Sequence, residues 1–198
     1  MKIGIYGGSF NPPHLGHLKM AQYMQRQLGT DKILIIPSNI SPQKSDNGNI
    51  DPVHRINMCR LAFSDPVFSV TDMEIKRGGK SYTVDTLSEI RKEYHNAELF
   101  LFMGSDMLLS FGSWYKPDKI SEMCTICAVS RDSGETAAKM REYAENEISG
   151  KVIILDKPPY ELSSTLVRQR LLSGEDCSDI LCGEVINYIK ENKLYGQQ

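Results

Sequence analysis

Residues 1–17 read MKIGIYGGSFNPPHLGH, a short apolar segment followed at once by two glycines, two prolines and two histidines. The apolar residues 2–6 predict a buried β-strand. Glycines directly after a strand permit a tight turn and a close approach of a ligand to the backbone. The apolar spacing from His17 to Leu28 predicts a helix that Gly29 ends. Unpaired N–H groups at the start of such a helix form a ready site for phosphate.

The rest of the chain alternates short apolar runs with longer amphipathic segments. Further strands are predicted at 32–37, 68–71, 98–103, 124–130 and 151–155, and further helices after Asp51-Pro52, at 81–94, from Ser163 and from Asp179. Strands separated by helices favour right-handed crossovers and parallel pairing. We therefore predict an α/β fold over residues 1–198, a single Rossmann-like, doubly wound domain whose mostly parallel sheet carries helices on both faces. Ligands of such sheets bind at the carboxyl ends of the strands.

Composition and charge exclude several classes of function. The net charge of −2 disfavours a nucleic-acid partner, which usually binds a basic surface. No apolar run approaches the length of a membrane span, and the first residues lack the apolar segment of a signal peptide. Five cysteines, an odd number, suit reduced thiols, so we expect a cytoplasmic protein. Cys124 and Cys127 would point to opposite faces of a strand, so no metal site is predicted there.

The pair His14 and His17 is the most distinctive chemical feature. Residues three apart on a first helical turn share a face, so both imidazoles would point at the same ligand atoms. An imidazole N–H can donate to phosphate oxygens, and Gly16 between the histidines leaves room for a ligand. The spacing matches neither GxGxxG nor GxxxxGK[ST], which disfavours a dehydrogenase or a P-loop kinase. A plain proline-glycine turn with exposed histidines is the alternative interpretation.

The opening stretch resembles the (G/T)-x-F-(D/N)-P-x-H-x-G-H signature of the nucleotidyltransferase superfamily that shares an HxGH motif with class I aminoacyl-tRNA synthetases. The matching residues are Gly8, Phe10, Asn11, Pro12, His14, Gly16 and His17. Residues 163–168, SSTLVR, resemble its second signature, S-S-T-x-(I/V)-R. Residues 36–44, 81–87 and 104–115 resemble the nicotinate or nicotinamide mononucleotide adenylyltransferases, particularly the bacterial nicotinate type. Gln43 stands where bacterial members often carry histidine.

This resemblance implies a reaction between ATP and nicotinate mononucleotide. The mononucleotide phosphate attacks the α-phosphorus of ATP, and pyrophosphate leaves. Because the attacking oxygen is already anionic, we expect donors and cations at the site and no general base. Mg²⁺ is expected as the cofactor, bound mainly through the ATP phosphates, with no metal ligand assigned to the protein.

The resemblance also implies residue roles. His14, His17 and Arg168 are the expected catalytic groups. The expected ATP-binding residues are Gly8, Ser9, Phe10, His14, His17, Gly104, Asp106, Ser163, Ser164, Thr165 and Arg168. The expected mononucleotide-binding residues are Asn39, Lys44, Tyr82, Thr83, Trp114 and Arg131. Asp106 is implied to bind the adenosine ribose and Trp114 to stack on the pyridine ring. Backbone N–H groups at Tyr82 and Thr83 would bind the nicotinate carboxylate.

Other interpretations of the sequence are an adenylyltransferase for nicotinamide mononucleotide, phosphopantetheine or a flavin nucleotide, and a nucleotide-binding sensor without turnover. The sequence leaves open the choice between acid and amide, and whether residues 38–50 close over the substrate. It also leaves open the oligomeric state, and a homo-oligomer is compatible with it.

Overall fold

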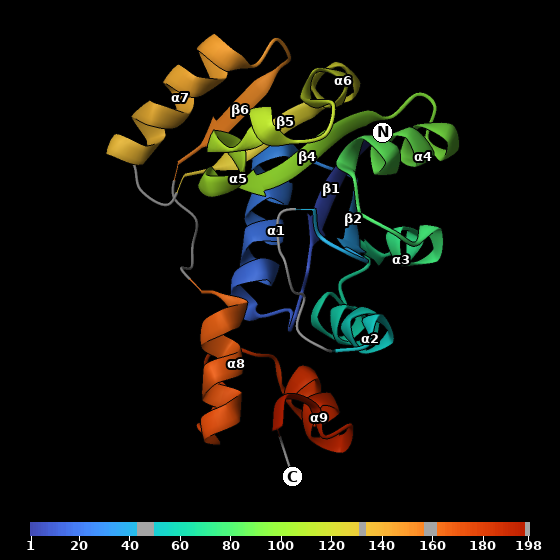
Figure 1. Ribbon diagram of the computed structural model, residues 1–198, viewed down its shortest axis with the longest axis vertical. Coiled ribbons are helices and arrows are strands. Elements are labelled where there is room, and N and C mark those ends of the chain that lie inside the picture. Colours follow the sequence, from blue (N-terminus) through green and yellow to red (C-terminus); the bar gives the residue numbers. More distant parts are fainter. Residues whose placement is uncertain (43–49, 131–133, 157–161, 197–198) are drawn as a thin grey trace.

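The fold is organised around one sheet of six parallel strands. The computed structural model describes residues 1–42, 50–130, 134–156 and 162–196. The strands are β1 (Lys2–Gly8), β2 (Lys32–Pro37), β3 (Phe68–Val70), β4 (Glu98–Gly104), β5 (Thr125–Val129) and β6 (Val152–Leu155), in the spatial order β3-β2-β1-β4-β5-β6. All five neighbouring pairs are parallel (Figure 1). The predicted parallel α/β sheet is thus confirmed, and each strand overlaps the range expected for it, although β1 is two residues longer and β4 one residue longer at the carboxyl end.

Helices connect the strands. They are α1 (Leu15–Leu28), α2 (Pro52–Ala62), α3 (Met73–Arg77), α4 (Thr83–Glu93), α5 (Ser105–Leu109), α6 (Pro117–Met123), α7 (Glu135–Glu147), α8 (Ser164–Ser173) and α9 (Gly183–Glu191), with the 3-10 helices η1 (Phe111–Ser113) and η2 (Leu194–Gly196). The Asp51 carboxylate caps α2 as its sequence predicts, accepting from the Val53 N–H at 2.8 Å. The helix expected from Asp179 begins four residues later, at Gly183.

The helices cover both faces of the sheet. Alternate residues of each strand enter opposite layers: Phe100 and Phe102 pack with α1, α2, α8 and α9, whereas Leu99 and Leu101 pack with α4, α5, α6 and α7. Strands buried on both faces need a continuous apolar sequence. Figure 1 shows α8 and α9 together at the end of the molecule opposite α6 and α7. In the described part of the chain, no helix is both long and apolar enough to cross a bilayer.

The two cysteines of the CxxC segment lie in different layers of the core. Cys124 packs in the layer of α4 and α6, and Cys127 packs in the layer of α1 and α2. Burial raises the pKa of both thiols, to about 12 in each case. Their side chains therefore act as small apolar groups.

Gly4 on β1 leaves room for side chains of the two neighbouring strands at the centre of the sheet. A Cβ at this position would lie 2.5 Å from Cζ of Phe102 and 3.1 Å from Cγ1 of Ile33. The Phe102 ring therefore fills the space that a side chain on β1 would need. Gly7 differs, because a Cβ there meets no atom within 4 Å.

We predict that Gly4→Ala lowers the free energy of unfolding by about 1–3 kcal/mol, because the added methyl overpacks the core. Urea denaturation of both proteins measures this change, and Gly7→Ala is the matched control. Equal effects of the two substitutions would show that the Phe102 ring moves aside without cost.

Candidate active site

The carboxyl ends of β1 and β4 define the centre of the site. The spatial order of the strands reverses between these two neighbours. Their pairing ends at Ile5 and Leu101, whereas β1 continues to Gly8 and β4 to Gly104. In open parallel sheets, ligands bind at the carboxyl ends of the strands where the order reverses. The segments that follow Gly8 and Gly104 therefore border the place where this fold binds ligands.

His14 and His17 cap the first helix for each other. The His17 N–H donates to Nδ1 of His14 at 3.3 Å, and the His14 N–H donates to Nδ1 of His17 at 3.2 Å. The two rings are stacked, with centroids 3.7 Å apart and planes 24° apart. This capping box uses imidazoles in place of the usual hydroxyl and carboxyl groups.

The capping bonds determine the chemistry that the histidines can offer. Because each Nδ1 accepts a backbone N–H, the proton of a neutral ring lies on Nε2. His14 is only 5% exposed, and desolvation lowers the pKa of His14 to about 4. His14 is therefore neutral at pH 7 and has an Nε2–H to donate. The alternative of two exposed histidines is wrong for His14.

Gly16 makes close packing possible around His14. A Cβ on Gly16 would lie 3.0 Å from Nδ1 of His14 and 3.1 Å from Cβ of Leu162. Our interpretation that Gly16 leaves room for a ligand is thus incomplete, because the His14 ring and Leu162 occupy that space. Gly16 therefore allows Leu162, which precedes the cap of α8, to pack against the start of α1.

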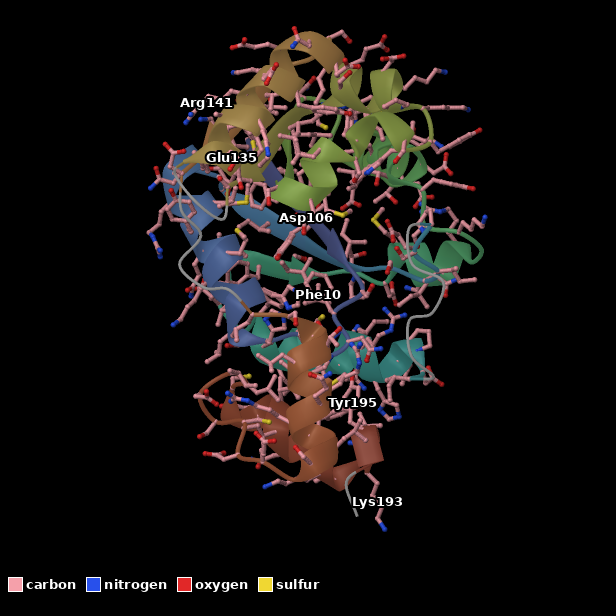
Figure 2. All side chains as sticks on the ribbon, turned by 60° about the vertical axis from the view of Figure 1, so that its left-hand side comes forward. Phe10, Asp106, Glu135, Arg141, Lys193 and Tyr195 are labelled. Atoms are coloured by element: carbon pink, nitrogen blue, oxygen red, sulfur yellow. The ribbon has the colours of Figure 1, made fainter. Side chains whose placement is uncertain are left out.

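The segment between β1 and α1 is held by buried donors from distant parts of the chain. Arg55, 1% exposed on α2, donates from a terminal guanidinium nitrogen to the Ser9 carbonyl at 2.9 Å. The Tyr195 hydroxyl donates to Oδ1 of Asn11. Figure 2 shows Phe10 near the start of α8 and Tyr195 closer to the C-terminal end of the molecule, and both belong to the same layer of the core. The backbone of this segment therefore has a fixed shape.

The start of α8 contacts the same segment. One terminal guanidinium nitrogen of Arg168 donates to the Asn11 carbonyl at 2.8 Å, and the other donates to Oγ1 of Thr165 at 3.2 Å. The Ser164 hydroxyl donates to the Pro12 carbonyl at 3.1 Å. The two signature motifs, at opposite ends of the sequence, thus lie in direct contact. Ser163 caps α8, accepting from the Leu166 N–H at 3.2 Å.

Phe10 is part of the core. Its side chain is 1% exposed, and its ring centroid lies 5.0 Å from that of His17 and 5.8 Å from that of Phe63. Its φ of 45° places the backbone in the left-handed region, which is uncommon for a residue with a large side chain. If Phe10 contacts a ligand, only its backbone is placed to do so.

A second group of expected residues gathers at the start of α4. The Asn39 N–H donates to Oγ of Ser81 at 2.9 Å, and its side-chain amide donates to the Gly79 carbonyl, also at 2.9 Å. The next two residues, Tyr82 and Thr83, are the N-cap and the first residue of α4. The segment after β2 is thus bound to the segment that begins α4.

The segment around Trp114 adjoins this group. The Tyr115 ring lies 4.6 Å from the ring of Tyr82, centroid to centroid. Trp114 is partly buried, and its ring lies 5.4 Å from that of Phe111. Its indole nitrogen is buried and has no hydrogen-bond partner among the described residues.

The remaining expected residues are Gly104, Asp106, Lys44 and Arg131. Gly104 ends β4 and precedes α5, and Asp106 is an exposed residue of α5. Lys44 and Arg131 lie outside the described residues, as does Gln43. Among the residues that the structure describes, no group of three or more His, Cys, Asp or Glu side chains could hold a metal ion.

Sequence reasoning missed Arg55 and Tyr195, which hold the segment after β1. Arg55 follows the predicted start of α2, where an arginine is usually a solvent-exposed helical residue. Tyr195 lies in η2, three residues before the last residue, Gln198. Neither position carries a pattern in a single sequence that reveals a buried hydrogen bond to a distant carbonyl or amide.

Comparisons with known proteins agree with this geometry. A profile of the family described as cytidylyltransferase-like matches residues 5–170. The nicotinate-nucleotide adenylyltransferase of Bacillus subtilis is 36% identical over 195 residues, which cover 98% of each chain. A probable nicotinate-nucleotide adenylyltransferase of Carboxydothermus hydrogenoformans is 39% identical over 197 residues, again 98% of each chain.

A solved structure shares the fold. The nicotinic acid mononucleotide adenylyltransferase of Plasmodium falciparum, complexed with NaAD, superimposes with a TM-score of 0.79 at 19% identity and covers 100% of this chain and 98% of its own. From the family profile and the full-length relatives we conclude that this chain belongs to the cytidylyltransferase-like family and, within it, to the nicotinate-nucleotide adenylyltransferases.

Proposed function

We propose that this chain transfers the adenylyl group of ATP to nicotinate mononucleotide, giving nicotinate adenine dinucleotide and pyrophosphate in NAD biosynthesis. The observation that carries the proposal is the contact between the His14–His17 pair and the start of α8, made through residues 11 and 12. It joins two groups of anion-binding donors at the place where the strand order reverses. The full-length relatives named for this activity support the same conclusion.

The mononucleotide phosphate attacks the α-phosphorus of ATP in line, and pyrophosphate leaves. The attacking oxygen is anionic already, so the protein has no proton to remove. Its task is to hold two anions together and to stabilise the charge that develops between them. His14 and His17 donate from Nε2 to the ATP phosphates, and the less buried His17 donates to the α-phosphate.

The start of α8 binds the leaving pyrophosphate in this mechanism. A helix of this length presents unpaired N–H groups and a partial positive charge at its first turn. Ser163 orients that turn as its cap, while Ser164 and Thr165 add hydroxyl groups. Arg168 brings a positive charge and holds the Asn11 carbonyl at the same time. Gly8, Ser9 and Phe10 contribute backbone, and Gly104 and Asp106 bind the adenosine.

The start of α4 binds the mononucleotide. The N–H groups at Tyr82 and Thr83 bind the nicotinate carboxylate, and Trp114 stacks on the pyridine ring. Asn39 supports the same pocket through its bonds to residues 79 and 81. Lys44 and Arg131 are candidates for the mononucleotide phosphate.

Mg²⁺ fits this site as a companion of ATP. The donors around the His14–His17 pair are N–H groups, hydroxyls and a guanidinium, which suit phosphate oxygens better than a metal ion. Magnesium commonly takes substrate phosphate oxygens and water as its ligands. When bound, the ion neutralises charge on the phosphates.

We further propose that residues 1–198 act as one domain in the cytoplasm, where the five free thiols stay reduced.

We expect purified protein with ATP, Mg²⁺ and nicotinate mononucleotide to release pyrophosphate and form the dinucleotide in equal amounts. Parallel reactions contain nicotinamide mononucleotide, phosphopantetheine or a flavin nucleotide in place of the acid. Pyrophosphate release only with one of these would assign a different acceptor. Nucleotide binding without release in any reaction would indicate a sensor.

We predict that His17→Ala lowers kcat by about 10²-fold or more, because a donor to the developing charge is lost. His17→Gln, which keeps an N–H donor at the end of the side chain, should retain more activity. Steady-state kinetics measure the effect, and circular dichroism checks the fold of each variant. Near-normal turnover in a folded His17→Ala protein would remove His17 from the mechanism.

We predict that His14 makes the protein less stable as the pH falls. Its pKa is about 4 when folded and 6.5 in its ordinary state, so the unfolded chain binds the proton first. The stability contributed by neutral His14 is present above pH 6.5 and is lost progressively down to pH 4. Between about pH 7 and pH 5 the loss is about 2 kcal/mol.

Urea unfolding at both pH values measures this loss. His14→Asn is the control, because asparagine keeps an N-cap acceptor but does not titrate. The variant should show a smaller fall in stability than the natural sequence. An equal fall in both proteins would contradict a neutral, buried His14.

A further inference from the structure

We infer that Glu74, a buried carboxylate on α3, positions the mononucleotide pocket through hydrogen bonds to two hydroxyl groups. Glu74 is 7% exposed. The Thr86 hydroxyl donates to its Oε1 at 2.6 Å, and a hydrogen bond from the Ser81 side chain lowers the pKa of the same carboxyl group. The inference rests on the proposed function, because it assigns the start of α4 and Asn39 to the mononucleotide.

The hydrogen bonds continue from Glu74 into the proposed pocket. Ser81 Oγ accepts the Asn39 N–H at 2.9 Å, which leaves its own O–H group for the hydrogen bond to Glu74. The Ser81 N–H donates to the Ile40 carbonyl at 2.9 Å. One carboxylate therefore fixes the segment after β2 and the residue just before Tyr82. A displacement of Ser81 would move both sides of the pocket together.

The second hydroxyl fixes α4 itself. Thr86 lies one turn after Thr83, is 2% exposed, and accepts from a terminal nitrogen of Arg77 at 2.9 Å while it donates to Glu74. The other terminal nitrogen of Arg77 donates to Glu89 at 2.8 Å. Glu74 thus holds the beginning of α4 from both sides, through Ser81 before the helix and Thr86 within it.

Filling the space beneath α4 does not require a buried carboxylate at position 74. Desolvation raises the pKa of Glu74, so its burial costs free energy that apolar side chains of similar size would not cost. The Arg77 guanidinium, 4.0 Å from Oε1, offsets part of that cost, and the hydrogen bonds to Thr86 and Ser81 offset a further part in a defined geometry, because a carboxylate accepts hydroxyl protons from defined directions. A buried polar network of this kind fixes the relative position of its parts.

We test this with Glu74→Gln. Glutamine has almost the same shape, but its amide nitrogen cannot accept a hydroxyl proton, so Ser81 or Thr86 must turn away. We expect the KM for nicotinate mononucleotide to rise about tenfold, as for the loss of one hydrogen bond to a charged group. The KM for ATP should change less than about twofold, because the His14–His17 pair and α8 are not part of this network.

Ser81→Ala is a second, milder variant that should reproduce this split between the two KM values. The double variant should be no worse than the more impaired single variant, because both changes break the same chain of bonds. Ser88→Ala is the matched control: its hydroxyl donates to the Val84 carbonyl within α4, at 2.7 Å, and the two KM values should stay unchanged.

Hydrogen exchange without substrate gives a readout that does not depend on the reaction. Amides of residues 79–86 should exchange faster in Glu74→Gln and Ser81→Ala than in the natural sequence or Ser88→Ala. Equal changes in both KM values, unchanged KM values, or unchanged exchange would each overturn the inference. Absence of turnover in the natural sequence would contradict the proposed function, and hydrogen exchange would then decide the role of Glu74.

Discussion

The site depends on the carbonyl oxygens between β1 and α1. Those of residues 9, 11 and 12 accept hydrogen bonds from Arg55, Arg168 and Ser164, which lie on α2 and α8. Residues 12 and 13 are prolines without an N–H, so the bonds to the carbonyls of residues 11 and 12 fix the turn itself, whereas the bond to the Ser9 carbonyl also fixes the orientation of the Phe10 amide. A hydrogen bond from a charged donor contributes about 1.5–3 kcal/mol. The position of the histidine pair therefore depends on helices that are distant in the sequence.

This constraint also determines the electrostatics of the proposed ATP site. The guanidinium groups of Arg55 and Arg168 donate to carbonyl oxygens of this segment, whereas desolvation keeps His14 neutral. The site therefore presents positive charge that does not depend on pH near neutrality, because arginine stays protonated. The net charge of −2 for the whole chain does not show this local arrangement. Fixed positive charge and neutral N–H donors suit a ligand with several phosphates.

The sequence predicted the parts of the structure that rest on local patterns. The strands buried on both faces are continuous apolar runs, and Asp51 with Pro52 marks the start of α2. It did not predict α7, whose buried residues Ala137, Met140 and Ala144 include two small side chains and form a weak pattern. Buried polar partners such as Arg55, Tyr195 and Glu74 were also missed. A hydrogen bond to a carbonyl or hydroxyl dozens of residues away leaves no spacing to recognise.

The two halves of the proposed site are built by opposite means. Under the segment after β1, positive side chains hold backbone oxygens. Beside the start of α4, a negative carboxylate holds hydroxyl protons. Arg77, 4.0 Å from Oε1 of Glu74, compensates that negative charge, whereas Arg168 adds its positive charge to the partial positive charge at the start of α8. This difference supports the proposed mechanism, in which the ATP phosphates bind at α8 and the single carboxylate of the nicotinate ring binds at α4. In this proposal the fold orients two anionic substrates by different means, with the charge of Arg168 at one and backbone N–H groups at the other.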